Sequence, residues 1–379
     1  MTQPTVFPDL VDTLAHVPSH GPVHAARQQR DKTTAATQGS LQALLDPALP
    51  QITLAERLLA AAYTARLTPA PELAAHYLER LQDLGGAAPA VAAALAARQH
   101  DTIAEPRLRA ILAYTHRLAT QPATGSQATL QALQQAGLDT AAVVALSQLV
   151  AFVSYQARVV AGVRALASHP GAPAPAAEVA ATPAAPAAPL QPLAINGYVD
   201  HALTWSAWLD TVQLEQATPE QLEVLEASHP KAKTSDYYLL LVQQPEILRQ
   251  RQIAFNAIMY APGGLSRAER ELAATVVSRV NGCVYCASVH AERFGQLAKR
   301  NDVIAQVFTD PQGAGTSARE KAIVQASIVL TREPAGDLAP TLAALRAQGL
   351  DDLQILDLVH AVAVFGWANR LMLNLGAPD

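Results

Sequence analysis

Alanine and leucine carry most of the hydrophobic positions along this chain, and β-branched runs that alternate with polar residues are few. This pattern favours helices over strands, because alanine and leucine have high helix propensity whereas strands are enriched in β-branched residues. The most apolar stretches, residues 141–153 and 355–365, are interrupted by polar side chains and are shorter than the roughly 18 residues of a membrane span. We therefore expect buried helices there and an all-α protein.

Two helices are predicted on either side of a bend near the only two cysteines. Residues 265–280 are expected to form the first helix, with Ser266 as its N-cap and Glu269 at the capping-box position. The Asn-Gly pair at 281–282 then breaks or bends the chain. The second helix is expected to begin there and to run through residue 300, which puts Cys283 in its first turn.

An alanine- and proline-rich tract at residues 168–192 interrupts the helical pattern. A tract with so many prolines can neither continue a helix nor bury a core, so we interpret it as an extended linker. It divides the chain of 379 residues into an N-terminal unit, residues 1–167, and a C-terminal unit, residues 193–379. Each unit is long enough to bury its own core.

The two units are related in sequence. Residues 55–81 align without gaps with residues 268–294, and residues 130–158 align with residues 342–370. Two gapless matches at nearly the same offset indicate a duplicated helical domain. We expect the two copies to pack as two subunits would, forming a pseudo-dimer that assembles further.

The duplication is most informative where the copies differ. The reactive side chains of the second copy are Glu271, Cys283, Cys286 and His290. Their partners in the first copy are Leu58, Ala70, Leu73 and Tyr77. Because the reactive groups are missing from the first copy as a set, we expect the first copy to be catalytically empty and the second to carry the site.

Helix geometry places the reactive side chains of the second helix together. At about 100° per residue, Cys283, Cys286 and His290 fall within roughly 60° of one another on one face. A helix N-terminus and a nearby imidazolium both favour a thiolate, so the arrangement is expected to lower a cysteine pKa. His290 lies one turn from Cys286 and is its natural base, and Glu271 joins them if the chain folds back at 281–282. The four groups would then form a proton relay around two thiols.

Charge and cysteine usage narrow the class of protein. The formal net charge is -5 and no cluster of lysine and arginine stands out, so we expect neither nucleic acid nor membrane as a partner. The N-terminus lacks a basic region followed by an apolar one, which predicts a cytoplasmic protein. In a reducing compartment a close cysteine pair indicates catalysis or metal binding more often than a structural disulfide.

The motif of residues 271–290 resembles a known family. The motif consists of a glutamate, eleven further residues, Cys-x-x-Cys and a histidine four positions after the second cysteine. Ala-Glu-Arg precedes it, and Asn-Gly stands before the first cysteine. This arrangement is similar to the alkylhydroperoxidase AhpD-like branch of the carboxymuconolactone decarboxylase superfamily. Residues 193–377 resemble its peroxidase-related proteins, and residues 9–167 resemble a degenerate companion domain. The chain departs from some relatives at Tyr285, where they have a histidine.

This resemblance implies a function and a set of partners. The expected fold is two tandem all-α AhpD-like domains, and the expected activity is thiol-dependent peroxide reduction without a bound cofactor or metal. Cys286 would be the peroxidatic cysteine, Cys283 the resolving one, and Glu271 and His290 the proton relay. The expected partners are a hydroperoxide, an external dithiol such as a lipoylated protein, and further copies of the chain.

Other interpretations of the same residues stay open on sequence alone. Cys283, Cys286, His290 and Glu271 are also a ligand set for zinc or iron. The dithiol also suits a disulfide reductase, a relic dithiol in a non-enzymatic protein, or two small buried residues. Lactone decarboxylation is a weaker alternative, because that chemistry does not call for a cysteine pair.

Two further features are assigned to packing rather than chemistry. Trp205, Trp208, Tyr237 and Tyr238 either line a substrate entrance or pack the N-terminal elements of the second unit, and we favour packing. His360 is expected to be a core histidine with a satisfied hydrogen bond, three residues from Asp357.

Overall fold

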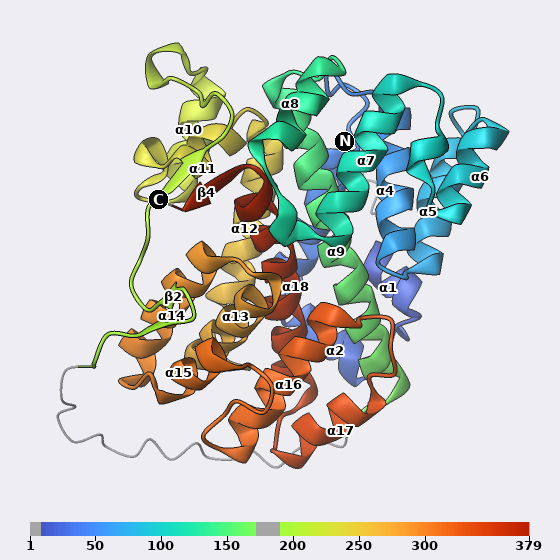
Figure 1. Ribbon diagram of the computed structural model, residues 1–379. Coiled ribbons are helices and arrows are strands. Elements are labelled where there is room, and N and C mark those ends of the chain that lie inside the picture. Colours follow the sequence, from blue (N-terminus) through green and yellow to red (C-terminus); the bar gives the residue numbers. More distant parts are fainter. Residues whose placement is uncertain (1–8, 172–189, 379) are drawn as a thin grey trace, which may run out of the picture.

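The computed structural model describes residues 9–171 and 190–378 (Figure 1). Residues 172–189, which make up most of the predicted linker, and residues 1–8 and 379 lie outside the described residues. The described chain contains eighteen α-helices, and its strands are only two or three residues long. The all-α prediction is therefore confirmed.

The helices before the predicted linker are α1 Leu10–Ala15, α2 Pro22–Gln28, α3 Asp31–Leu44, α4 Leu54–Leu67, α5 Pro71–Gln82, α6 Pro89–Ala97, α7 Pro106–Thr120, α8 Gln127–Gln135 and α9 Thr140–Ser168. The helices after it are α10 Pro219–Ser228, α11 Asp236–Leu241, α12 Pro245–Met259, α13 Arg267–Asn281, α14 Val284–Ala298, α15 Asp302–Thr309, α16 Ala318–Arg332, α17 Ala339–Ala347 and α18 Asp352–Asn374. The short strands are β1 Ala194–Ile195, β2 Tyr198–Val199, β3 Trp205–Ala207 and β4 Gly376–Pro378.

The two longest helices, α9 and α18, pack along each other at the centre of the molecule (Figure 1). Both are long and apolar enough to cross a membrane, yet the most apolar window of each is entirely buried in the protein. Burial of this kind is expected of core helices, whose apolar surface is removed from water by neighbouring helices. The buried helices predicted at residues 141–153 and 355–365 are confirmed as parts of α9 and α18.

The helix pairs α4–α5 and α13–α14 are built on the same framework. Each pair starts with a capping box, formed by Thr53 with Glu56 in α4 and by Ser266 with Glu269 in α13. Each capping glutamate also accepts a hydrogen bond from an arginine of a neighbouring helix. The Nε atom of Arg107 lies 2.6 Å from Glu56, and the Nε atom of Arg319 lies 2.6 Å from Glu269.

The central helices exchange contacts in the same reciprocal way. Arg158 of α9 donates to the Thr331 carbonyl of α16 at 2.6 Å, and Arg370 of α18 donates to the Ala119 carbonyl of α7 at 2.8 Å. Reciprocal contacts of this kind are what a two-fold interface between like units produces. We propose that the chain is a tandem duplication whose copies pack as a pseudo-dimer, and these matched contacts support the proposal.

The end of the chain is attached beside the start of the second unit. Strand β4 pairs antiparallel with β3, and the Trp205 indole N–H donates to the Met372 carbonyl at 3.0 Å. Gly376 is required for this approach, because a Cβ atom there would lie 2.2 Å from the Ser206 carbonyl oxygen. Trp205 therefore packs the fold, as predicted.

Candidate active site

The predicted bend between α13 and α14 is confirmed. α13 ends at Asn281, and Gly282 follows in the left-handed conformation with φ 76°, which residues with a Cβ rarely adopt. The Asn281 side chain donates to Asn369 of α18 at 3.0 Å, which ties the bend to the core. Cys283 is the N-cap of α14 rather than a member of its first turn, so the helix begins one residue later than expected.

The bend brings Glu271 and His290 into direct contact. The Nδ1 atom of His290 lies 2.5 Å from Oε2 of Glu271, and Oε1 of the same carboxylate accepts a hydrogen bond from Nε of Arg267 at 2.6 Å. Glu271 has no exposed side-chain surface, and His290 is partly buried. The predicted fold-back of Glu271 onto the second helix is therefore present.

The carboxylate of Glu271 is held ionised despite its burial. Burial alone would raise the pKa of Glu271, but the charges of His290 and Arg267 and their hydrogen bonds outweigh it and leave this pKa below the ordinary carboxyl value. The ring of Phe365 packs edge-on against the His290 imidazole, with 4.4 Å between centroids. Because the Glu271 carboxylate engages Nδ1, it fixes which ring nitrogen of His290 is left for other partners.

Cys283 and Cys286 are free thiols at the start of α14. Cys283 is 1% exposed and Cys286 is 5% exposed, so Cys286 is the more accessible sulfur. Burial is the first cause that raises the pKa of the Cys283 thiol well above its ordinary value, and hydrogen bonding and charge repulsion from Cys286 add to it. The Cys286 backbone N–H and the Asn369 side chain oppose this shift without reversing it. The expectation that the helix N-terminus lowers a cysteine pKa is therefore wrong for Cys283, because desolvation is the larger effect.

The relay is less complete than the sequence predicted. Among the described residues no hydrogen bond joins His290 to Cys286, so the structure brings together Glu271 with His290 and Cys283 with Cys286 as two adjoining pairs. Burial raises the pKa of Tyr285 to about 12. Tyr285 is consequently a neutral phenol at physiological pH and does not replace a histidine as a base.

Comparison with known proteins relates the segment around the cysteines to a described family. Residues 245–327 match the Carboxymuconolactone decarboxylase family. The match runs from the start of α12 into α16 and contains Glu271, both cysteines and His290. Residues 245–327, called here the carboxymuconolactone decarboxylase segment, are therefore similar to that family.

Two solved structures resemble part of the chain. One, from Ralstonia eutropha JMP134, is described as an alkylhydroperoxidase AhpD core and an uncharacterized peroxidase-related protein; it is 23% identical, with a TM-score of 0.39, over 45% of this chain and 90% of its own. The other, an uncharacterized peroxidase-related protein from Silicibacter sp. TM1040, is 23% identical with a TM-score of 0.37, over 43% of this chain and 88% of its own. No curated protein matches the chain.

The carboxymuconolactone decarboxylase segment is not arranged as a metal centre. Within residues 9–171 and 190–378, no three side chains from histidine, cysteine, aspartate and glutamate come together as a metal-binding group. Glu271 is already engaged by Arg267 and His290, which leaves its oxygens occupied. The geometry therefore does not support the zinc or iron interpretation.

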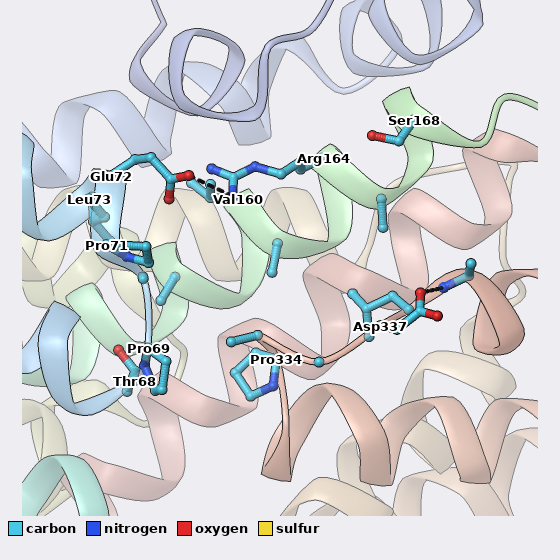
Figure 2. Close-up of a pocket in the computed structure, with 18 of the residues that line it drawn as sticks. Thr68, Pro69, Pro71, Glu72, Leu73, Val160, Arg164, Ser168, Pro334 and Asp337 are labelled. Atoms are coloured by element: carbon cyan, nitrogen blue, oxygen red, sulfur yellow. Dashed lines mark hydrogen bonds and ion pairs between the residues drawn. The ribbon is translucent and has the colours of Figure 1, made fainter.

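A cavity of about 340 Å³ lies away from the cysteines. It is lined by residues of α5, α9 and the loop before α17 (Figure 2). Glu72 and Arg164, which both line it, already form an ion pair at 3.1 Å (Figure 2). Neither cysteine lines this cavity, so we place the candidate site at the α13–α14 bend, where the reactive groups are.

The carboxymuconolactone decarboxylase segment also contains a buried group that the sequence did not single out. Arg251 of α12 is 4% exposed, and its guanidinium carbon lies 5.4 Å from the Tyr237 ring centroid, 6.0 Å from that of Phe255 and 5.8 Å from that of Trp367. The Tyr237 hydroxyl is buried and has no hydrogen-bond partner among the described residues. No sequence motif marks Arg251, because an unpaired cation is recognised only once its neighbours are placed.

His360 lies in the core of α18, as predicted, but no hydrogen bond to it is present among the described residues. Burial, reinforced by the positive charge of Arg27, lowers the pKa of His360 to about 3, so it is neutral at physiological pH. The expected hydrogen bond to satisfy it is not found. Asp357 instead binds Arg30 and Arg270.

Proposed function

We propose that this protein is a thiol-dependent peroxidase that reduces hydroperoxides at Cys286 and Cys283. The observation that carries the proposal is the buried contact between Glu271 and His290, on the same two helices that present two free and adjacent thiols. A buried acid–base pair beside a dithiol provides both the nucleophile and the proton transfer that peroxide reduction needs. The superfamily match over all four residues supports the same assignment.

The chemistry begins at the more accessible sulfur. The Cys286 thiolate attacks one peroxide oxygen, the O–O bond breaks, and Cys286 becomes a sulfenic acid. The departing alkoxide takes a proton and leaves as an alcohol. The Cys283 thiol then attacks the sulfenic sulfur, an S–S bond forms, and water is released. An external dithiol, for which a lipoylated protein is our candidate, reduces the disulfide and is itself oxidised.

Glu271 and His290 would move the protons of these steps. The ionised Glu271 accepts the hydrogen bond of His290 Nδ1 and keeps Nε2 directed away from it. Nε2 would accept the proton of the attacking thiol and return it to the leaving oxygen, either directly or through a water molecule. A raised Cys283 pKa suits this sequence, because it keeps Cys283 protonated while Cys286 reacts first.

Burial of the dithiol favours a small substrate. Both sulfurs are at least nine-tenths covered, which admits a hydroperoxide or a slender dithiol arm but not a folded protein disulfide. This favours the peroxidase over a reductase of protein disulfides. We also propose that the protein is cytoplasmic and that several copies of the chain assemble. A monomeric mass in solution at low concentration would contradict the assembly.

The test is oxidation of the reduced protein by a panel of hydroperoxides, followed as loss of free thiols. Two thiols should be lost per protein, and faster than from free cysteine at the same concentration. Oxidation of each pair should release one equivalent of alcohol, and added dihydrolipoamide should then restore both thiols and be oxidised to lipoamide. If no hydroperoxide oxidises the pair faster than free cysteine, the peroxidase assignment is wrong.

A further inference from the structure

Arg251 differs from the other buried arginines of the described residues. Seven arginines are buried there: Arg27, Arg30, Arg57, Arg158, Arg251, Arg270 and Arg370. Six of them donate to a carboxylate or to backbone carbonyls, whereas Arg251 has no hydrogen bond or ion pair with any described residue. Its Nε atom is buried without a hydrogen-bond partner, as are those of Arg57, Arg158, Arg270 and Arg370, but these four arginines are bound through their Nη atoms and Arg251 is not.

A buried guanidinium without a hydrogen-bond or ion-pair partner lowers the stability of the folded protein, so the surroundings of Arg251 need an explanation. Removing a charge from water is unfavourable unless an opposite charge or hydrogen bonds replace the water. The rings of Tyr237, Phe255 and Trp367 lie around the Arg251 guanidinium, and contacts of a cation with such rings recover only part of this loss. The rings therefore leave the buried Nε of Arg251 without a hydrogen-bond partner, and its Nη atoms bind no described residue.

A second unused donor lies on the same ring system. The guanidinium of Arg251 lies over the ring of Tyr237, whose hydroxyl is also buried without a partner, the residue being 9% exposed. Buried hydroxyls are nearly always hydrogen-bonded, so an unpaired buried hydroxyl on a ring that packs against an unpaired guanidinium is unusual. Together they offer a forked cation and a neutral O–H to one anionic group.

Two sets of interactions connect these donors to the redox pair and its histidine. Cys286 is close enough to Tyr237 for its charge to add to the burial that raises the Tyr237 pKa. A run of ring contacts also leads from Arg251 to His290: the guanidinium lies against Phe255, Phe255 lies 6.0 Å from Phe365, and Phe365 lies 4.4 Å from His290. Packed side chains therefore connect Arg251 and Tyr237 to the segment that carries Cys286 and His290.

We propose that Arg251 and Tyr237 bind the carboxylate of the substrate, which is an organic hydroperoxide with an apolar body and a carboxylate group. The planar fork of arginine matches two carboxylate oxygens, and the rings of Phe255 and Trp367 provide the apolar wall. The assignment rests on the peroxidase function proposed for Cys286. It adds to that function a charge requirement that the cysteines alone do not impose.

Binding is tested first, without any thiol chemistry. Decanoate is titrated calorimetrically into the reduced full-length protein, with 1-decanol and inorganic phosphate as the neutral and the non-apolar probes. Decanoate should bind, and Arg251→Met should weaken it about tenfold or more, the loss expected for a charge-assisted hydrogen bond. Tyr237→Phe should weaken it about threefold. Equal binding of decanol, or of phosphate, would overturn the carboxylate assignment.

Stability separates a binding role from a structural one. Because Arg251 is unpaired without ligand, Arg251→Met should keep or raise the unfolding midpoint of the free protein, whereas a structural arginine would lower it. Decanoate should raise the midpoint of the wild type and not of the variant. Arg249→Met, two positions away on α12 in an exposed ion-pair cluster with Glu223 and Glu246, is the matched control and should bind decanoate normally.

Reactivity then connects the anion site to the dithiol. A fatty-acid hydroperoxide should oxidise the wild-type thiols about tenfold or more faster than its methyl ester, and Arg251→Met should bring this ratio near one. Arg251-dependent decanoate binding without any peroxide reactivity would overturn the proposed peroxidase and retain the anion site. If the thiols react with peroxide at equal rates for the acid and the ester and decanoate does not bind, the anion site is overturned and the proposed peroxidase is retained.

Discussion

The helix pairs α4–α5 and α13–α14 share a framework and differ in their chemistry. Both begin with a capping box whose glutamate also binds an arginine, and both carry a buried arginine that donates to backbone carbonyls of the preceding loop. Those arginines are Arg57, which reaches Leu44 and Asp46, and Arg270, which reaches Ala261 and Gly263. The framework groups are therefore the ones that the helix pair needs to fold.

The positions of the reactive groups, unlike those of the framework, differ between the two helix pairs. In the first pair Tyr77 stands where the second has His290, and its hydroxyl donates to Gln156 of α9 at 2.5 Å. Leu58 stands where the second pair has Glu271 and is buried among apolar side chains. In the pair α4–α5, apolar side chains and one neutral hydrogen bond therefore occupy the positions that the reactive groups occupy in α13–α14. The comparison shows that the acid–base pair and the thiols of α13–α14 are not required by the fold.

The largest expected effect comes from the attacking sulfur. Cys286→Ser should slow peroxide reduction by about three orders of magnitude or more, because an alcohol is not ionised at neutral pH and cannot replace the thiolate. Cys283→Ser should still be oxidised once, but stop as a sulfenic acid that dimedone traps. Mass spectrometry after one equivalent of hydroperoxide measures both.

Ala70→Ser is the matched control for the cysteine variants. It places the same side chain at the N-cap of α5, the position equivalent to Cys283, and should leave thiol oxidation unchanged. Wild-type oxidation of Cys283 in the Cys286→Ser protein would reverse the two assigned roles.

The next effect concerns the acid–base pair. His290→Gln and Glu271→Gln should each slow thiol oxidation by about 10²- to 10⁴-fold, the range expected for loss of a general acid–base group. The double variant should be no slower than His290→Gln alone, because Glu271 acts through His290. Stopped-flow tryptophan fluorescence follows the reaction. Additive losses in the double variant would contradict a single relay.

Tyr77→Phe tests the same position in the other copy. It removes the hydrogen bond to Gln156 and leaves a buried amide oxygen unpaired, so it should cost about 1–3 kcal/mol of stability. It should not change the oxidation rate. A slower rate would mean that the first pair takes part in the chemistry.

The framework was accessible from sequence because it is local. The N-cap of Ser266, the bend at Gly282 and the fold-back of Glu271 all follow from side chains within a few turns of one another. The pKa of Cys283 was not accessible, since it depends on burial by distant helices and on Asn369 of α18. Arg251 was missed for a related reason: its position on α12 is that of any charged residue, and only the tertiary structure shows that it pairs with none of residues 9–171 and 190–378.

A smaller effect tests whether the framework is shared. Arg57→Met and Arg270→Met should each lower the free energy of unfolding by about 2–4 kcal/mol, because each leaves buried carbonyl groups without a hydrogen-bond donor. Arg270→Met also removes one of the two arginines that bind Asp357. Chemical denaturation measures both losses. Arg249→Met, on the surface, should stay within about 0.5 kcal/mol of the wild type. A loss confined to Arg270→Met would show that only the second pair depends on its arginine.

The smallest effect is a pH dependence that is expected of the helix pair α13–α14 and not of the pair α4–α5. The folded pKa of Glu271 lies below the ordinary value of 4.5, so the unfolded chain binds the proton more tightly than the folded one. The stability that Glu271 contributes is therefore present above pH 4.5 and is lost as the pH falls through its folded pKa. The wild type should exceed Glu271→Gln by about 1.5 kcal/mol near pH 6, the scale of a charge-assisted hydrogen bond, and the gap should shrink below pH 4. Leu58→Met, at the equivalent apolar position, should shift stability equally at both pH values. A gap between wild type and Glu271→Gln that widens on acidification would show that Glu271 is protonated in the folded protein, and the relay would then lack its carboxylate.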